Sequence, residues 1–179
     1  MGLDILTFAQ TTVFDEASNE ISLGQLWQNQ TAIFIFLRHF ACMACRSHAA
    51  QIWKDREKYQ KVGAKIYFIG NGTPQFVRIF KEDLNIQEAP VFTDPSLDSF
   101  RAAGFRRGFL AALGPRALIN GVRMMADGNK NTPYEKAAGD LWQLGGVAVI
   151  KRDGKVAYHY ISEVLGDYPP EKDLSDQVN

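Results

Sequence analysis

A hydrophobic run that ends in two closely spaced cysteines constrains this chain more than any other feature. The run lies within TAIFIFLRHFACMACRSH, at 31–48, and residues 33–37 have the length and apolar content of a strand buried on both faces. From Cys45 onwards, apolar residues recur at the i, i+4 and i+7 spacing of a helix. The sequence therefore predicts a buried strand that passes directly into a helix, with Cys42 and Cys45 at the junction.

This position favours a reactive thiol for an electrostatic reason. A thiol is nucleophilic only as the thiolate, and a free cysteine, with a pKa near ~8.5, is mostly protonated at neutral pH. The first turn of a helix presents unpaired N–H groups and the positive end of the helix dipole, and both favour the anion. If the helix starts near Met43, Cys42 lies exposed at that end and Cys45 lies one turn further in. We therefore expect Cys42 to be the attacking thiolate and Cys45 the resolving thiol.

Neighbouring groups are expected to support the charged sulfur. The backbone N–H groups from Ala44 to residue 46 belong to the first turn and would stabilise the anion. Arg38 and Arg46 lie close to the cysteines in the sequence and would add positive potential, although Arg46 is equally well placed to point into solvent. Arg38 and Ala44 are therefore candidate support residues.

Three other roles for the two cysteines stay open on the sequence alone: inert core packing, a metal site and a structural disulfide. Cys42, Cys45 and His48 share a Cys-x2-Cys-x2-His spacing, but a closed zinc site takes four ligands and usually a second pair, which the sequence does not offer. A disulfide between residues three apart closes a very small loop and constrains little. We therefore expect a redox-active pair, with no metal and no bound cofactor.

Length and charge limit the other classes of function. A chain of 179 residues fits one compact domain, 1–179, with a sizeable core. Lys plus Arg and Asp plus Glu both number 20, so net charge gives no reason to expect binding to nucleic acid or an anionic membrane. The opening MGLDILTFAQ does not read as a secretory signal, and no window approaches the ~20 apolar residues of a spanning helix. We expect a cytoplasmic protein, where a lone Cys-x-x-Cys is more often catalytic than structural.

The order of the expected elements indicates an α/β fold. Alternating strands and helices after residue 31 imply parallel pairing through right-handed crossovers, and Asp153-Gly154 between two apolar runs predicts a final antiparallel hairpin. Together they predict a thioredoxin-like sandwich, a central mixed sheet flanked by helices with an N-terminal extension. The expected pieces are extended segments at 5–8, 12–14 and 20–21, a short helix at 23–27 capped by Ser22, a helix from 43 to about 61 that stops at Gly63, a strand at 64–69, a helix from Pro74 to 84, a strand at 90–93, a helix from 95 that stops at Gly104, and a hairpin at 147–161.

Between residues 106 and 142 the alternation lapses, which indicates a helical insertion. Residues 109–125 are apolar and predict a helix, whereas 127–140 are polar and predict a loop. The apolar part would either roof an apolar substrate or form packed core or the face of a homodimer. In such a fold the cysteines lie at the carboxyl end of a central strand, where ligands bind in open α/β sheets. The loop that leads into the hairpin, with Gly145 and Gly146, is expected to face them.

Four segments in the same order and spacing resemble the peroxiredoxin-like branch of the alkyl hydroperoxide reductase/thiol-specific antioxidant (AhpC/TSA) superfamily, which includes the prostamide/prostaglandin F synthases. They are FLRHFACMACR at 36–46, GFLAALGPRALINGVR at 108–123, GDLWQLGGVAVIKRDGKV at 139–156, and Gly166-Asp167. The resemblance implies a thioredoxin fold and a redox-active disulfide between Cys42 and Cys45. It also implies reduction of peroxides or endoperoxides with electrons from thioredoxin or a similar dithiol donor.

The chain also departs from the pattern of a true peroxiredoxin, Pro-x-x-x-Thr-x-x-Cys. His39 stands three residues before Cys42, and Ile35 stands seven before it. Gly145-Gly146 stands where thioredoxin places a cis-proline opposite its cysteines. The predicted function is a thiol-dependent oxidoreductase that reduces peroxides. The alternatives are a thioredoxin-like protein disulfide reductase and a non-catalytic redox-sensing module.

Overall fold

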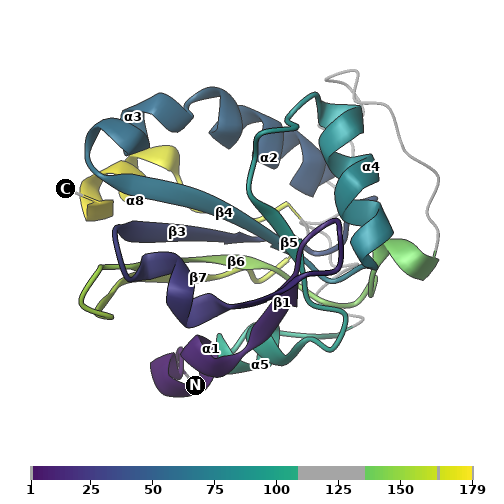
Figure 1. Cartoon of the computed structure of the whole chain (residues 1–179), viewed down its shortest axis with the longest axis horizontal. Helices are drawn as coiled ribbons and strands as arrows, with labels where there is room; N and C mark the ends of the chain where they lie inside the picture. The colour runs from purple at the N-terminus through teal and green to yellow at the C-terminus, as the bar shows by residue number, and fades with distance from the viewer. Residues whose placement is uncertain (1, 109–135, 165, 179) are drawn as a thin grey trace.

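The computed structural model describes residues 2–108, 136–164 and 166–178, and a mixed seven-stranded sheet forms its centre (Figure 1). Strands β3, β4 and β5 pair in parallel, whereas β6 pairs antiparallel with β3 and with β7. Helices cover both faces, so the predicted mixed sheet flanked by helices is confirmed. Across the sheet the strands are β2 (Glu20–Ser22), β1 (Thr12–Phe14), β5 (Val91–Thr93), β4 (Ala64–Gly70), β3 (Thr31–Phe36), β6 (Gly146–Ile150) and β7 (Val156–Ile161).

Two apolar cores lie on the two faces of the sheet, and β3 contributes to both. Ile33 and Ile35 point into one core, and Phe34 and Phe36 point into the other, as the alternation of side chains along a strand requires. Each such fully buried side chain contributes roughly 1.5–3 kcal/mol of hydrophobic free energy. The predicted central strand is therefore confirmed as a well-anchored element, and the cysteine segment starts from its end.

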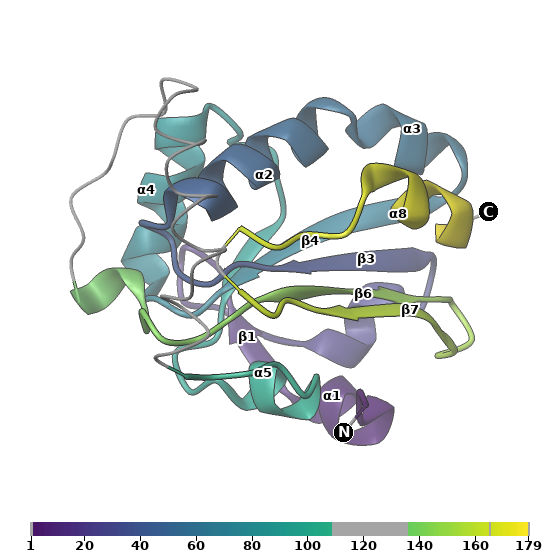
Figure 2. The same ribbon diagram turned by 180° about the vertical axis from the view of Figure 1, so that it is seen from behind.

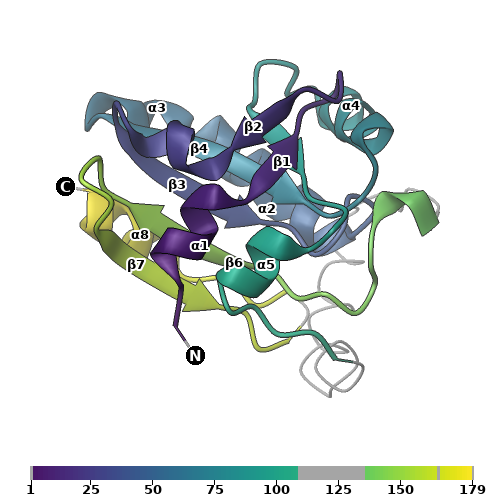
Figure 3. The same cartoon turned by 60° about the horizontal axis from the view of Figure 1, so that its bottom comes forward.

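The helices divide between these two faces, as the views from opposite sides show (Figures 1 and 2). Figure 3 shows the N-terminal face from the front, with α1 and α5 lying over the sheet. The face that packs against Ile33 and Ile35 carries α2 (Met43–Lys54), α3 (Arg56–Lys61), α4 (Pro74–Leu84) and α8 (Glu171–Val178), and the other face carries α1 (Ile5–Gln10), the 3-10 helix η1 (Leu23–Trp27) and α5 (Asp98–Ala102).

Three predictions about the helices are wrong. Ser22 precedes η1 but its side chain does not cap the helix, because its Oγ donates to Ala9 O at 2.7 Å. Residues 5–8 form part of α1 instead of an extended segment, because the Asp4 carboxylate caps the helix by accepting a hydrogen bond from Thr7 N at 3.2 Å. The helix expected from 43 to about 61 divides into α2 and α3 at Asp55. Its end is as predicted, since Gly63 adopts a left-handed φ of 74° that stops the helix.

The last hairpin and the start of the insertion are also defined. Gly154 has a φ of 84° and lies in the turn between β6 and β7, where Lys151 N donates to Lys155 O at 2.9 Å. This confirms the predicted Asp-Gly hairpin. The helix predicted over 109–125 and most of the loop predicted over 127–140 lie outside the described residues. The described residues on the two sides of this gap lie next to each other, because Arg107 pairs with Gln143 in an isolated antiparallel bridge. The 3-10 helix η2 (Lys136–Ala138) directly follows the gap.

Within the described part of the chain, no helix combines the length and the apolar character needed to cross a membrane.

Candidate active site

Cys42 and Cys45 lie at the start of α2, just beyond the end of β3. Cys42 is the N-cap residue, and its Sγ accepts a hydrogen bond from Cys45 N at 3.5 Å. The predicted start of the helix near Met43 is confirmed. The predicted exposure of Cys42 is wrong, because only 5% of its surface is accessible, compared with 0% for Cys45. Both unbridged thiols are buried in the apolar cluster that also contains Phe40 and packs against Tyr168.

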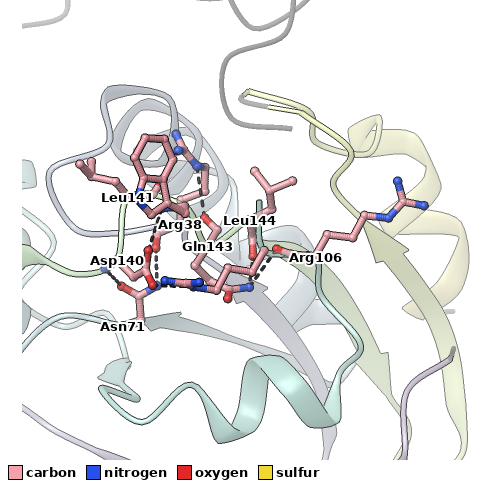
Figure 4. A network of polar contacts seen from close by, with 9 residues as sticks. Arg38, Asn71, Arg106, Asp140, Leu141, Gln143 and Leu144 are labelled. Atoms are coloured by element: carbon pink, nitrogen blue, oxygen red, sulfur yellow. Dashed lines mark hydrogen bonds and ion pairs between the residues drawn. The ribbon is translucent and has the colours of Figure 1, made fainter. Parts of the chain in front are cut away.

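Arg38 provides the positive charge at this pair. Its side chain is only 9% exposed, and Nη1 lies 4.0 Å from Cys42 Sγ, while its backbone N–H donates to Cys45 Sγ at 3.3 Å. Nε donates to Gln143 O at 3.3 Å and Nη2 to Leu141 O at 2.5 Å, as Figure 4 shows. No carboxylate in the described ranges forms an ion pair with Arg38. A buried cation held only by carbonyl dipoles stabilises an anion next to it, and here that anion is a sulfur.

The segment that holds Arg38 is itself fixed by Asn71, at the end of β4. Asn71 Nδ2 donates to Arg38 O at 2.6 Å, and Asn71 Oδ1 accepts from Asp140 N at 2.8 Å. The Asp140 carboxylate in turn accepts from Trp142 N at 2.8 Å and from Arg107 Nε at 2.7 Å. The buried amide therefore ties the β3 end to residues 140–143, where two backbone carbonyls accept from the guanidinium (Figure 4).

The contacts of the reduced pair favour a thiolate on Cys45 over one on Cys42. Burial raises the pKa of Cys45, but hydrogen bonding by the Cys42 thiol, the charge of Arg38 and hydrogen bonding by Tyr168 outweigh burial and lower it to about 6. The pKa of Cys42 is raised, because its thiol donates to Cys45 and is itself buried. This differs from the predicted charge on Cys42. The reason is that hydrogen bonding by the Cys42 thiol, by Tyr168 and by the Arg38 backbone lowers the pKa of Cys45, whereas hydrogen bonding to Cys45 and burial raise the pKa of Cys42.

Tyr168 is a member of the site that the sequence did not reveal. It comes from the segment between β7 and α8 and packs against the core cluster that contains both cysteines, and hydrogen bonding by its hydroxyl contributes to the lowered pKa of Cys45. Its ring stacks on His48 with centroids 3.9 Å apart and an angle of 14° between the rings. The only signal in the sequence was its place directly after Gly166-Asp167.

The two histidines near the pair are neutral at physiological pH. Burial lowers the pKa of His48 to about 4, and burial with the charge of Arg38 lowers that of His39 to about 3. The ring of His48 packs against Tyr168, although the spacing to the cysteines had allowed a metal site. In the ranges that the structure describes, no three His, Cys, Asp or Glu side chains are grouped to hold a metal ion.

The first turn of α2 supports the sulfurs through its backbone. The N–H that reaches Cys42 Sγ is that of Cys45, whereas Arg46 N donates to Cys42 O at 3.0 Å. Ala44 is buried in the same turn and packs in the core. The Arg46 guanidinium points away from the cysteines and pairs with Asp83 at 2.9 Å, so it is not part of the positive charge at the pair.

Gly145 and Gly146 lie beside the end of β3 and allow close packing there. A Cβ on Gly145 would lie 2.0 Å from Phe36 O and 3.6 Å from Arg38 N. A Cβ on Gly146 would lie 2.3 Å from both the Phe105 ring and Tyr160 O. The absent side chains let β6 approach β3 and β7, which brings the carbonyls of the preceding residues to Arg38.

The sequence of this chain matches a family model and several known proteins. A family model described as AhpC/TSA antioxidant enzyme matches residues 51–164. The prostamide/prostaglandin F synthase of Xenopus laevis is 30% identical over 174 residues, covering 94% of this chain and 84% of that protein. The chloroplastic thioredoxin-like protein AAED1 of Arabidopsis thaliana is 27% identical over 169 residues, covering 90% of this chain and 67% of that protein.

Solved structures place the fold among the peroxiredoxins. Peroxidoxin BcpB of Mycobacterium tuberculosis superposes with a TM-score of 0.66 at 16% identity, covering 94% of this chain and 90% of the other. Peroxiredoxin Q of Xanthomonas campestris gives a TM-score of 0.65 at 11% identity, covering 97% and 89%. At these identities the likeness concerns the fold, and it confirms the predicted thioredoxin-like architecture.

Proposed function

The chain belongs to the AhpC/TSA antioxidant enzyme family, whose function is thiol-dependent redox chemistry, and from that premise we propose that it is a peroxide reductase. In this proposal Cys42 and Cys45 alternate between a dithiol and a disulfide. The proposal rests mainly on one observation. Arg38 is a buried cation next to two unbridged thiols, and no carboxylate of the described chain neutralises it. Such a site keeps one thiolate available at neutral pH.

The oxidative half of the cycle begins with a proton transfer within the pair. The thiol proton of Cys42 passes to Cys45, and the Cys42 thiolate attacks a peroxide oxygen. An S–O bond forms, the O–O bond breaks, and the alcohol or water leaves with the proton held by Cys45. The Cys45 thiolate then attacks the Cys42 sulfenic acid, forming the S–S bond, and hydroxide leaves with a proton from solvent. Two thiols and one peroxide thus give a disulfide, an alcohol and water.

Cys42 takes the attacking role in this proposal because of its position. Cys42 is the more accessible residue of the two, and it caps the helix, where the N–H of Cys45 and the charge of Arg38 stabilise the developing anion. Cys45, with no exposed surface, holds the charge in the resting state and later closes the disulfide.

The reductive half needs an external dithiol, and we propose a thioredoxin-type protein. Its first thiolate attacks Cys42, and the Cys42–Cys45 bond breaks with Cys45 leaving as thiolate. Its second thiolate then resolves the mixed disulfide and releases Cys42, so the donor is oxidised to its own disulfide. No bound cofactor takes part in this scheme.

Thiol counting tests the proposal directly. Reduced protein treated with excess peroxide is expected to lose two titratable thiols. Cys42→Ser is expected to keep its remaining thiol, and Cys45→Ser is expected to trap a sulfenic acid on Cys42. Steady-state peroxide consumption is then followed with thioredoxin and its reductase as donor. Full retention of both thiols in the wild-type protein would refute peroxide reduction.

Ring peroxides belong in the same assay. Relatives named prostamide/prostaglandin F synthase suggest an endoperoxide, whose O–O bond would be cleaved to two hydroxyl groups by the same two thiols. Comparing hydrogen peroxide, a lipid hydroperoxide and an endoperoxide under identical donor conditions identifies the preferred class by kcat/KM.

A protein disulfide reductase is the second candidate, and one observation favours it. The side chain of His39, three residues before Cys42, is buried and neutral, so the hydroxyl that a peroxiredoxin offers to peroxide at this position is absent. Reduction of insulin disulfides with dithiothreitol as donor distinguishes the two activities. Turnover with insulin but none with any peroxide would favour the reductase.

A further inference from the structure

Tyr168 is half-buried and packs against the core cluster that contains both cysteines. Hydrogen bonding between its hydroxyl and the Cys45 sulfur lowers the pKa of Cys45, and burial together with the nearby sulfurs raises the pKa of Tyr168, so the phenol stays protonated. The ring is clamped against His48 at 3.9 Å. Because His48 lies one turn beyond Cys45 on α2, the stack fixes the phenol beside the inner sulfur.

The loop before Tyr168 is built to hold that position. The Asp167 carboxylate accepts a hydrogen bond from Tyr160 Oη at 2.5 Å and from Glu163 N at 2.7 Å. The carbonyl of Asp167 accepts from Ser162 Oγ at 2.7 Å. These contacts tie the loop to the end of β7, so Tyr168 is placed by a rigid element of the sheet.

The residues after Tyr168 restrict it further. Two prolines follow, and a residue that precedes proline is confined to extended backbone conformations. The segment then enters α8, whose Leu174 and Val178 are buried in the same core cluster as the cysteines. In Figure 2 this segment runs alongside α2. Tyr168 is therefore held from both sides against the inner cysteine.

We propose that Tyr168 is a catalytic residue of this site, whose hydroxyl stabilises Cys45 as the leaving thiolate when the Cys42–Cys45 disulfide is opened. This role rests on the proposed dithiol cycle. When a donor thiolate attacks Cys42, the S–S bond breaks and Cys45 departs with the electron pair. The Tyr168 O–H keeps its proton and donates to the new anion, and the donor sulfur is left in a mixed disulfide with Cys42. A leaving thiol of lower basicity departs faster.

The charged and titratable groups around Cys45 come from different segments of the chain. Arg38 lies on the β3 side, Cys42 lies in the first turn of α2, and Tyr168 comes from the segment before α8. His48 stands behind the Tyr168 ring and is neutral. Once Cys42 is bonded to the donor it has no thiol proton to give, so Tyr168 is the side-chain hydroxyl that remains at the departing sulfur.

A titration in the Cys42→Ser background isolates this contact. The chain has two cysteines, so the thiolate absorbance of this variant reports Cys45 alone. Adding Tyr168→Phe removes one oxygen and retains the ring that stacks on His48. We expect the midpoint for Cys45 to rise by about one pH unit, since a hydrogen bond to a charged group is worth about 1.5 kcal/mol or more. Tyr158→Phe, a half-buried tyrosine of β7, is the matched control and is expected to leave the midpoint unchanged.

An unchanged midpoint in Tyr168→Phe, with native far-ultraviolet circular dichroism, would overturn the role. If that variant does not fold, the near-ultraviolet tyrosine band of Cys42→Ser decides instead: it is expected to shift as Cys45 ionises, and a constant band would overturn the role. With both cysteines present, reduction of the Tyr168→Phe disulfide by dithiothreitol is expected to be slower than in the Tyr158→Phe control. None of these measurements uses a peroxide, so a protein that fails to consume peroxide while showing the shift would refute only the proposed function.

Discussion

Replacing Arg38 with methionine tests the electrostatic basis of the site. The side chain keeps its approximate length and loses its charge. The Arg38 guanidinium lies 4.0 Å from Cys42 Sγ, beside the sulfur pair whose resting charge is on Cys45, and two unit charges at about this separation interact by about 4 kcal/mol at an effective dielectric constant of about 20. This corresponds to at most about three pKa units. The hydrogen bonds from Arg38 N–H and from Tyr168 remain in the variant, so we expect the pKa of Cys45 to rise by about two units from about 6.

The result is measurable as a loss of thiolate. A pKa near 6 gives about 90% thiolate at pH 7, and a two-unit rise leaves about 10%. Ultraviolet absorbance of the reduced protein from pH 4 to 10 gives the midpoint, and the rate of alkylation at pH 7 is expected to fall by about the same ninefold factor. Arg38→Lys should lie between the two proteins, because an ammonium keeps the charge but loses the planar fork that contacts Leu141 and Gln143.

Arg46→Met is the matched control. It removes the same charge from a residue in the first turn of α2, but the Arg46 guanidinium is already paired with Asp83. We expect a shift of a few tenths of a unit at most. An unchanged midpoint in Arg38→Met, or an equal shift in both variants, would refute the assignment of Arg38 as the local counter-charge.

Three further predictions follow from the same contacts. Folding lowers the pKa of Cys45, so the stability that its thiolate gives the reduced protein is lost as pH falls through about 6. The urea concentration at the unfolding midpoint should therefore rise between pH 5 and pH 8, and this rise should be smaller in Arg38→Met. Gly145→Ala should destabilise by roughly 2–4 kcal/mol in urea unfolding, because its Cβ would meet a backbone carbonyl at 2.0 Å, whereas Gly108→Ala, with open space around it, should change stability little. Asn71→Ala should lose about 2 kcal/mol and raise the pKa of Cys45, because it removes two hydrogen bonds that hold the Arg38 segment; an unaltered thiolate midpoint in a variant that has lost this stability would contradict that coupling.

Local sequence signals predicted the junction that carries the cysteines. The change from a buried strand to helical spacing lies within a few residues, and the N-cap position of Cys42 follows from it. The sequence also predicted the positions of Gly63 and Gly154, because a left-handed φ at the end of a helix or in a hairpin turn is a local requirement. The missed helix α1 had a local signal too, since Asp4 three residues before Thr7 is a capping pattern.

The sequence did not predict which of the two cysteines carries the negative charge, because that depends on contacts between distant segments. Arg38 was named for its closeness in sequence, but its effect comes from carbonyls at 141 and 143 that leave its charge unneutralised. Tyr168 reaches Cys45 only after the sheet and α8 have formed. Sequence spacing places a sulfur at the start of a helix. Which of two sulfurs carries the charge is decided by the donors that tertiary structure adds.

This arrangement also sets the direction of the redox balance. In the dithiol state the Arg38 charge faces a thiolate, whereas in a Cys42–Cys45 disulfide it would face none, so the charge favours the reduced form. With a pKa of about 6 in place of the ordinary 9.0, the reduced form gains about 1.4 kcal/mol at pH 7, which raises the reduction potential by about 30 mV. Arg38→Met should lose most of this stabilisation of the reduced form, and equilibration against a glutathione or dithiothreitol buffer should show a lower reduction potential. A variant potential equal to the wild-type value would mean that the charge acts on the rate of attack alone and leaves the disulfide equilibrium unchanged.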